Sequence, residues 1–170
     1  MKIIGINYDM LISSAALVVD GEIVAAVAEE RLNRDKKFRN FPRQSLSYCL
    51  ERGGLEIRDI DYVAQAWNPG IHMEKFHPMA SGRRRYRHEY LYSIPDHLVD
   101  FYQRPKINYI EQKHMLDTGE TMSVLYLEHH FCHAANAFYM SPFDRAAVLT
   151  VDGRGERDTT CFCGIDYIND

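Results

Sequence analysis

The chain has 170 residues and a mass of 19.8 kDa, which is enough for one domain with its own core and short for two. It is 46% hydrophobic and 26% charged, a composition that excludes a disordered or collagen-like chain. A net charge of −4 and a pI near 6.0 argue against a nucleic-acid partner. No apolar run approaches the roughly 20 residues of a membrane span, and the first residues lack the pattern of a signal peptide. We therefore expect a soluble, cytoplasmic protein with no membrane partner.

The first thirty residues predict three strands of one sheet. They cover 2–8, 13–19 and 22–28, and Asp20-Gly21 between the last two is a hairpin signal. Continuous apolar character in the second and third strands predicts burial on both of their faces, so helices are expected to cover this sheet.

A charged stretch at 29–40 follows and is expected to be a solvated loop or helix edge. The basic cluster at 83–87 is interpreted as a solvated face, with an RNA or phosphate contact as the alternative. Further elements are expected along the chain: helices over 43–52 and 129–140, and strands over 60–67, 122–127, 146–151 (buried) and 159–165. This order of strands and helices predicts an α/β fold.

Two histidines near the end of the chain are candidate metal ligands. His129 and His133 are four residues apart, so on a helix both imidazoles lie on one face, close enough to share an ion. His130 points roughly a hundred degrees away around the same helix. The alternative is that these histidines cap the helix or satisfy buried polar groups.

Two small-residue loops are candidate phosphate or metal sites. The loop at 152–156 has glycines that let the backbone approach a ligand, and a carboxylate that can hold a cation. The stretch at 13–16 follows the first strand and offers hydroxyl and amide groups to phosphate oxygens. Either loop alone can be an ordinary turn. Because ligands of α/β proteins bind beyond strand ends, the loops and the histidine block together favour a binding site.

Two blocks of residues form a specific combination. The first consists of Gly5-Ile6-Asn7, the run from Ser13 to Gly21, and Ala28-Glu29-Glu30-Arg31-Leu32. The second consists of Glu128-His129-His130, His133-Ala134-Ala135, Ala137-Phe138-Tyr139, Ser141-Pro142-Phe143 and Val148 through Glu156. With these blocks the chain resembles the bacterial O-carbamoyltransferases of the nodulation-factor and antibiotic type, and the resemblance is weak only between about 71 and 121.

This resemblance implies an actin-like ATPase (ribonuclease H-like) fold. Its mixed sheet would start as a three-stranded antiparallel meander, with helices on both faces. Residues 1–144 would form the N-terminal actin-like lobe, and residues 145–170 the first strands of a truncated second lobe. The expected macromolecular partner is therefore the missing C-terminal lobe or, alternatively, a second copy of the chain.

The resemblance also implies an activity and a set of site residues. Family members use carbamoyl phosphate and ATP to make a carbamoyl-adenylate, and then transfer the carbamoyl group to a hydroxyl of a small-molecule acceptor. His129 and His133 would bind a divalent metal ion, with Asp152 as a third ligand or a ligand to bound phosphate; iron, zinc and manganese all suit such a set. The residues implied to line the nucleotide are Asn7, Ser13, Ser14, Gly153, Gly155 and Glu156.

Two positions depart from the family pattern. The family carries a histidine and an aspartate just before the serine–alanine run, and that histidine is a candidate base. Here Leu11 and Ile12 stand in their place, and an aliphatic group cannot accept a proton. We therefore assign no catalytic residue. The leading hypothesis is part of a carbamoyltransferase that has little or no activity by itself; the alternative is a non-catalytic metal- or nucleotide-binding homologue or assembly module.

Overall fold

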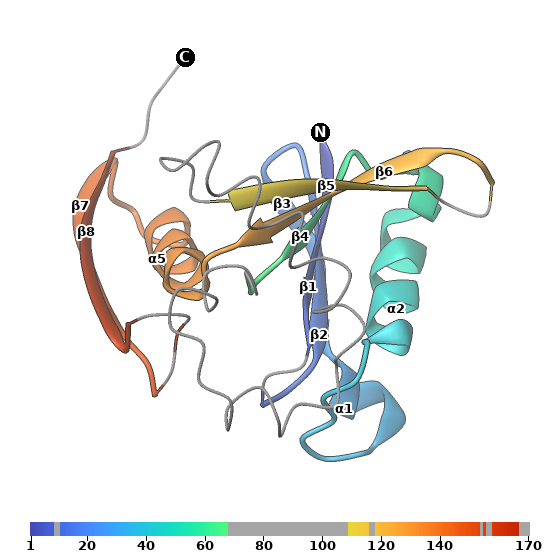
Figure 1. Ribbon diagram of the computed structural model, residues 1–170, viewed down its shortest axis with the longest axis horizontal. Coiled ribbons are helices and arrows are strands. Elements are labelled where there is room, and N and C mark those ends of the chain that lie inside the picture. Colours follow the sequence, from blue (N-terminus) through green and yellow to red (C-terminus); the bar gives the residue numbers. More distant parts are fainter. Residues whose placement is uncertain (9–10, 68–108, 116–117, 154, 156–157, 167–170) are drawn as a thin grey trace. The chain divides into compact units, whose positions relative to one another are not determined.

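The computed structural model describes residues 1–8, 11–67, 109–115, 118–153, 155 and 158–166 (Figure 1). They belong to two units. The first unit comprises Met1–Ala66 and Tyr109–Tyr126, and the second comprises Trp67–Asn108 and Leu127–Asp170. The basic cluster at 83–87 and Glu156 lie outside the described residues. The predicted lobe boundary at 144/145 stays a prediction.

The first unit is built on a six-stranded mixed sheet, in the order β3-β2-β1-β4-β6-β5 (Figure 1). Its strands are β1 (Lys2–Asn7), β2 (Ser14–Val19), β3 (Glu22–Ala28), β4 (Tyr62–Gln65), β5 (Tyr109–Met115) and β6 (Thr121–Leu127). β1, β2 and β3 form an antiparallel meander, whereas β4 runs parallel to both β1 and β6. The predicted α/β class and the meander are confirmed. β5 lies in a stretch for which no strand was predicted.

The turn between β2 and β3 explains why the meander could be predicted. Asp20 and Gly21 both have positive φ, 50° and 88°, as the tightest hairpin turn requires. Glycine adopts this conformation without strain, and aspartate tolerates it better than most residues.

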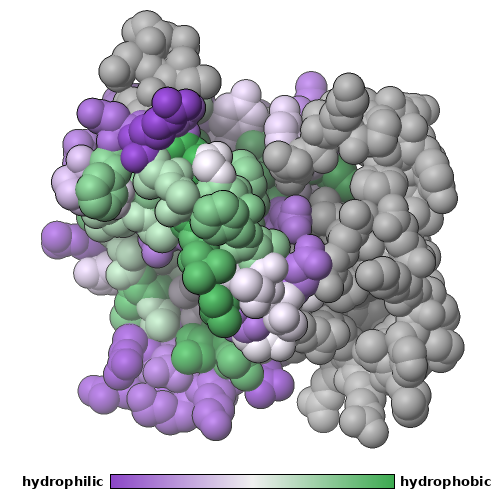
Figure 2. All heavy atoms as spheres, turned by 90° about the vertical axis from the view of Figure 1, so that its left-hand side faces the viewer, coloured by the Kyte–Doolittle hydropathy of each residue, from purple (hydrophilic) through white to green (hydrophobic). Residues whose placement is uncertain are grey.

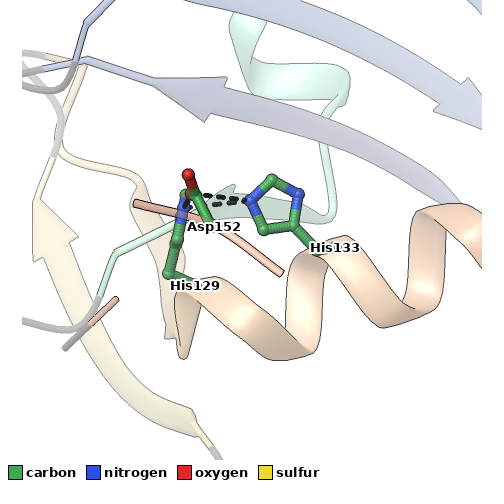
Figure 3. Close-up of side chains that lie close together, drawn as sticks. All are labelled: His129, His133 and Asp152. Atoms are coloured by element: carbon green, nitrogen blue, oxygen red, sulfur yellow. Dashed lines mark hydrogen bonds and ion pairs between the residues drawn. The ribbon is translucent and has the colours of Figure 1, made fainter. Parts of the chain in front are cut away.

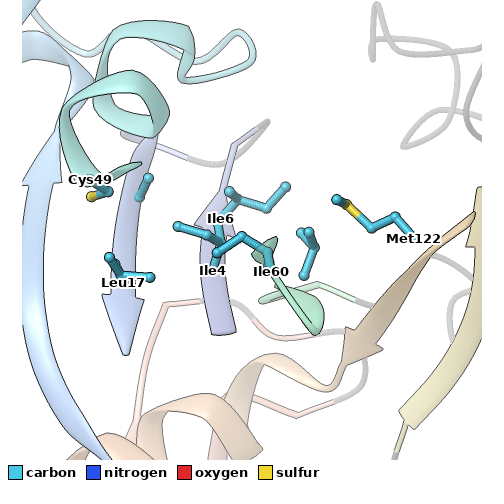
Figure 4. Close-up of a cluster of buried hydrophobic side chains, with 8 residues drawn as sticks. Ile4, Ile6, Leu17, Cys49, Ile60 and Met122 are labelled. Atoms are coloured by element: carbon cyan, nitrogen blue, oxygen red, sulfur yellow. The ribbon is translucent and has the colours of Figure 1, made fainter. Parts of the chain in front are cut away.

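One helix covers the buried side of β2 and β3. α2 (Arg43–Gly53) packs on these strands and ends at Gly54, where φ is 63°. A Cβ added to Gly53 would lie 2.5 Å from Leu17 Cδ2, so glycine lets the helix end approach the strand. A short 3-10 helix, η1 (Ile57–Asp59), leads into β4. The core beneath α2 consists of Ile4, Ile6, Ala15, Leu17, Cys49, Ile60, Val63 and Met122 (Figure 4).

The charged stretch after β3 is largely exposed, as predicted, but its first two carboxylates are buried. Glu29 and Glu30 begin α1 (Glu29–Asn33), and Glu29 is only 2% exposed. Pro42 at the N-cap of α2 makes no side-chain cap, which leaves N–H groups of its first turn without helical partners. Glu29 accepts two of them, from Gln44 at 3.1 Å and Ser45 at 2.7 Å. The carboxylate of Glu29 is thus a cap supplied from outside the helix.

In the second unit, one helix packs on one face of a strand pair. α5 (His129–Tyr139) lies against β7 (Arg145–Val151) and β8 (Thr160–Asp166), which pair antiparallel. Ala134 and Phe138 of α5 meet Val148 in a small core. The helix, both strands and their predicted limits are confirmed to within two residues.

The outward face of this strand pair is exposed, which corrects the prediction of a buried strand at 146–151. Leu149 is 62% exposed and Phe162 is 75% exposed. Figure 2 shows hydrophobic side chains gathered on the side of the molecule where β7 and β8 lie. Similarly, β3 is at the edge of its sheet and leaves Ile23 and Val24 exposed, although burial on both faces was predicted. In both places the strand is apolar on both faces, but described residues pack against only one of them.

Among the described residues, no helix is long and apolar enough to cross a membrane.

Candidate metal centre

The helix α5 brings the two candidate histidines to one side. It begins at His129 after Glu128, whose backbone is extended, and an alanine-rich stretch carries it to Tyr139. Just beyond its end, the Ser141 hydroxyl donates a hydrogen bond to the Phe138 carbonyl at 2.7 Å. His129 and His133 are therefore one helical turn apart, as their spacing predicts.

Asp152 completes a group of three possible ligands. It follows β7 directly, and its Oδ2 lies 2.8 Å from His129 Nε2 and 3.2 Å from His133 Nε2. The two Nε2 atoms are 3.0 Å apart. Figure 3 shows the three side chains directed at one another, two from α5 and one from the loop after β7. The structure brings together the three residues that the sequence singled out as ligands.

Hydrogen bonds keep the Asp152 carboxylate ionised. The bonds from His129 and from the backbone N–H of Gly153, which lies 2.6 Å from Oδ1, lower the pKa of Asp152 to about 2. His133 adds to this effect. An ionised carboxylate beside two imidazoles is a suitable donor set for a divalent ion.

The spacing of the three donor atoms fits a shared ion. Atoms that bind one ion at about 2.1 Å lie about 3.0 Å apart in an octahedral arrangement and about 3.4 Å apart in a tetrahedral one. The three separations of 2.8, 3.0 and 3.2 Å fall close to the octahedral value. Nearly buried Trp67 packs edge-on against the His129 ring at 5.8 Å, whereas His133 is about half exposed. One side of the group is therefore packed, and another is open to solvent.

The other predicted binding residues divide between the two units. Asn7 and Ser14 are direct partners across β1 and β2. Ser13 is fully buried: its hydroxyl donates to the Asn40 carbonyl at 2.6 Å, and its N–H donates to the Phe38 carbonyl at 2.8 Å. The hydroxyl and the N–H of Ser13 are therefore both engaged in hydrogen bonds within the protein. Leu11, at the position of the missing base, is 70% exposed.

The two loop glycines differ in their surroundings. A Cβ at Gly153 would meet nothing within 4 Å, although the N–H of this residue is already donated to Asp152 Oδ1. A Cβ at Gly155 would lie 2.4 Å from His130 Cδ2 and 2.5 Å from the Asp158 carbonyl oxygen. Gly155 is therefore required by close packing inside the protein.

The surroundings of the three candidate ligands could not be predicted from the sequence. Trp67 follows β4 by two residues, and nothing local marks it as a neighbour of His129. For His130 the sequence predicted the direction, away from the other two histidines, but neither its burial nor its partners. Its contacts with Thr150 and Asp158 depend on how β7 and β8 return to α5.

Comparison with known proteins identifies the family of the chain. Residues 2–166 match the family model described as "Carbamoyltransferase N-terminus". The chain belongs to this family, which confirms the resemblance seen in the sequence.

Two relatives show how the chain compares with longer proteins. The uncharacterized protein sll1178 of Synechocystis sp. is 36% identical over 171 residues, covering 93% of this chain and 26% of that protein. Nodulation protein NolNO of Sinorhizobium fredii is 34% identical over 143 residues, covering 84% of this chain and 19% of that protein. The chain thus spans about a quarter or less of the length of these relatives.

Proposed function

We propose that this chain is the N-terminal, actin-like part of a carbamoyltransferase that moves a carbamoyl group, through a carbamoyl-adenylate, to a hydroxyl of a small-molecule acceptor. ATP and carbamoyl phosphate would be the co-substrates. Family membership over residues 2–166 supports the transferase class. The observation that carries the proposal is the convergence of His129, His133 and Asp152 within 3.2 Å of one another.

The three residues would hold a divalent ion through two Nε2 atoms and Oδ2. When bound, such an ion supplies positive charge beside the phosphate oxygens, where negative charge develops as the adenylate leaves. Asp152 contributes a carboxylate that stays ionised. Packing of Trp67 against His129 fixes the orientation of that ring.

Phosphate groups would be bound by open backbone near Asp152. Gly153 leaves space for a phosphate oxygen to approach the backbone, because no neighbouring atom occupies the position of its missing side chain, but its own N–H is held by Asp152 Oδ1. We propose Asn7, Ser14 and Glu156 as further nucleotide contacts. Ser13 and Gly155 would act indirectly, since Ser13 already uses both donors and Gly155 packs on His130.

A second candidate function is a non-catalytic binding or assembly module. It is favoured by Leu11, an exposed aliphatic side chain where the family's candidate base would stand. Without a base at this position, the usual gain of roughly two to four orders of magnitude from proton abstraction must come from another group or be absent. We therefore expect no carbamoyl transfer from the 170-residue chain alone. Incubation of the chain with ATP, carbamoyl phosphate and a hydroxyl acceptor tests this expectation directly.

The partner that we propose is the remaining part of such a transferase, seated on the outward face of β7 and β8. The family description places the matched region at the N-terminus of longer proteins, and Leu149 and Phe162 are exposed on this face. A stable dimer of the chain that Phe162→Lys abolishes would assign the face to a second copy instead.

The metal site is tested by titrating the chain separately with Zn²⁺, Mn²⁺ and Fe²⁺ in a calorimeter. We expect one ion per chain, and we expect His129→Ala with His133→Ala to abolish binding. His114→Ala is the matched control, because His114 is exposed on β5 in the other unit. Unchanged stoichiometry in the double variant would show that the histidine pair is not a metal site.

A further inference from the structure

A third histidine lies beside the candidate ligands without joining them. His130 is only 2% exposed. Its Nδ1 is 2.8 Å from Thr150 Oγ1, and its Nε2 is 2.7 Å from the backbone carbonyl oxygen of Asp158. Both ring nitrogens are engaged within the protein, so neither is available to a metal ion.

These two contacts fix which nitrogen carries the proton. A carbonyl oxygen can only accept a hydrogen bond, so Nε2 carries the hydrogen and donates it to Asp158. In the neutral ring Nδ1 then accepts, and the Thr150 hydroxyl donates to it. The ring is held at both ends, in one tautomer.

The two partners of His130 lie on either side of Asp152 in the chain. Thr150 precedes Asp152 by two residues in β7. Asp158 is followed by Thr159, whose carbonyl accepts the Asp152 N–H at 2.8 Å. One ring therefore ties both ends of the loop to α5, next to the helical residue His129.

Gly155 shows how closely this loop approaches the ring. Any side chain there would meet His130 Cδ2 at 2.4 Å, a distance that Cβ atoms do not adopt. The backbone at Gly155 can approach the His130 ring this closely only because this residue is glycine.

We propose that His130 is a positioning residue, which locks the loop after β7 onto α5 so that the Asp152 carboxylate reaches both His129 and His133. This inference rests on the proposed metal-binding function and assigns His130 no contact with the ion. Substitution of a group that orients a metal ligand without touching the ion commonly lowers metal affinity by about 10- to 100-fold.

The test compares three threonine variants. Thr150→Val keeps the shape of the side chain and removes the hydroxyl that bonds Nδ1, whereas Thr150→Ser keeps that hydroxyl. Thr160→Val makes the same chemical change at an exposed position of β8 and serves as the control. We expect Thr150→Val to weaken Zn²⁺ binding about tenfold, and the other two variants to bind as the wild type does.

A second measurement does not need the metal. Amide exchange in the metal-free chain should become faster at Asp152 in Thr150→Val and His130→Ala, and nitrogen NMR should show the Nε2–H tautomer of His130 in the wild type. Thr150→Val keeps the test valid if His130→Ala does not fold.

The outcomes separate this inference from the proposed function. Wild-type Zn²⁺ affinity together with unchanged exchange at Asp152 in Thr150→Val would overturn the positioning role. If the wild-type chain binds no ion, the proposed metal site fails, and the exchange rate at Asp152 alone decides whether His130 holds the loop. An Nδ1–H tautomer would also contradict the proposal.

Discussion

The two units contain the same kind of cross-strand pair in opposite surroundings. In the first unit, Ile4 of β1 faces Leu17 of β2, and both are fully buried. In the second unit, Leu149 of β7 faces Phe162 of β8, and both are largely exposed. Each pair joins two large apolar side chains across an antiparallel ladder. The difference lies in what covers them: α2 and the surrounding core bury the first pair, and no described element covers the second.

An apolar strand therefore indicates a face that can be buried, and not one that is buried. It extends to the polar residues. In the first unit, Glu29 and Ser13 are used to hold segments of the chain together. In the second unit, polar side chains converge on a partly exposed site around Asp152. Buried polar groups thus serve the packing of the first unit, whereas those around Asp152 form the candidate metal site of the second.

Alanine substitutions in the two apolar pairs should differ most in their effect on the free energy of unfolding. Leu17→Ala should lower the free energy of unfolding by about 2–5 kcal/mol, because it leaves a cavity in a packed core. Leu149→Ala should change it by about 0.5 kcal/mol or less, because the side chain is exposed. Urea unfolding of both variants checks this. Equal losses would mean that the outward face of β7 is covered in solution.

The next effect concerns the buried cap of α2. Glu29→Gln should cost about 2 kcal/mol, because one of the two N–H groups that the carboxylate accepts is left facing an amide donor. Glu51→Gln, on an exposed position of the same helix, is the control and should leave the unfolding midpoint unchanged. If the two variants unfold alike, Glu29 does not cap the helix in solution.

A smaller loss is expected at the loop after β1. Ser13→Ala should cost about 1–2 kcal/mol, because the buried hydroxyl no longer satisfies the Asn40 carbonyl. Ser14→Ala, one residue further along, should have a smaller effect on stability. Thermal unfolding with and without ATP separates the two roles of this loop: an unchanged melting temperature for Ser13→Ala, with weaker ATP binding, would make Ser13 a direct ligand.

The smallest effect depends on pH. A hydrogen bond from the backbone N–H of Lys37 lowers the pKa of Glu30, against the raising effect of burial. Because the folded pKa is below the unfolded one, the stabilisation is fully present above about pH 4.3 and is lost as the pH falls through the folded value. Glu30→Gln should therefore be less stable than the wild type at neutral pH and equal to it in strong acid. A difference that persists in strong acid would contradict this origin.

Local sequence was enough for the elements and for part of the site. Asp20-Gly21 set the hairpin, because two adjacent positive φ angles suit few other residue pairs. The four-residue spacing of His129 and His133 put both rings on one side of a helix, because the helical repeat is close to four. These features depend on residues that are near one another in the chain, so they could be predicted.

Tertiary structure decided what those elements meet. Asp152 is 23 residues from His129, and its approach depends on the pairing of β7 with β8 and on the packing of α5. Glu29 looked solvated by composition and became a cap, because α2 lacks one of its own. Leu17 and Leu149 have the same side chain in similar strands, yet only one is buried. Burial and hydrogen-bond partners come from segments that are distant in the sequence. A local pattern therefore does not predict which distant segment will pack against an element.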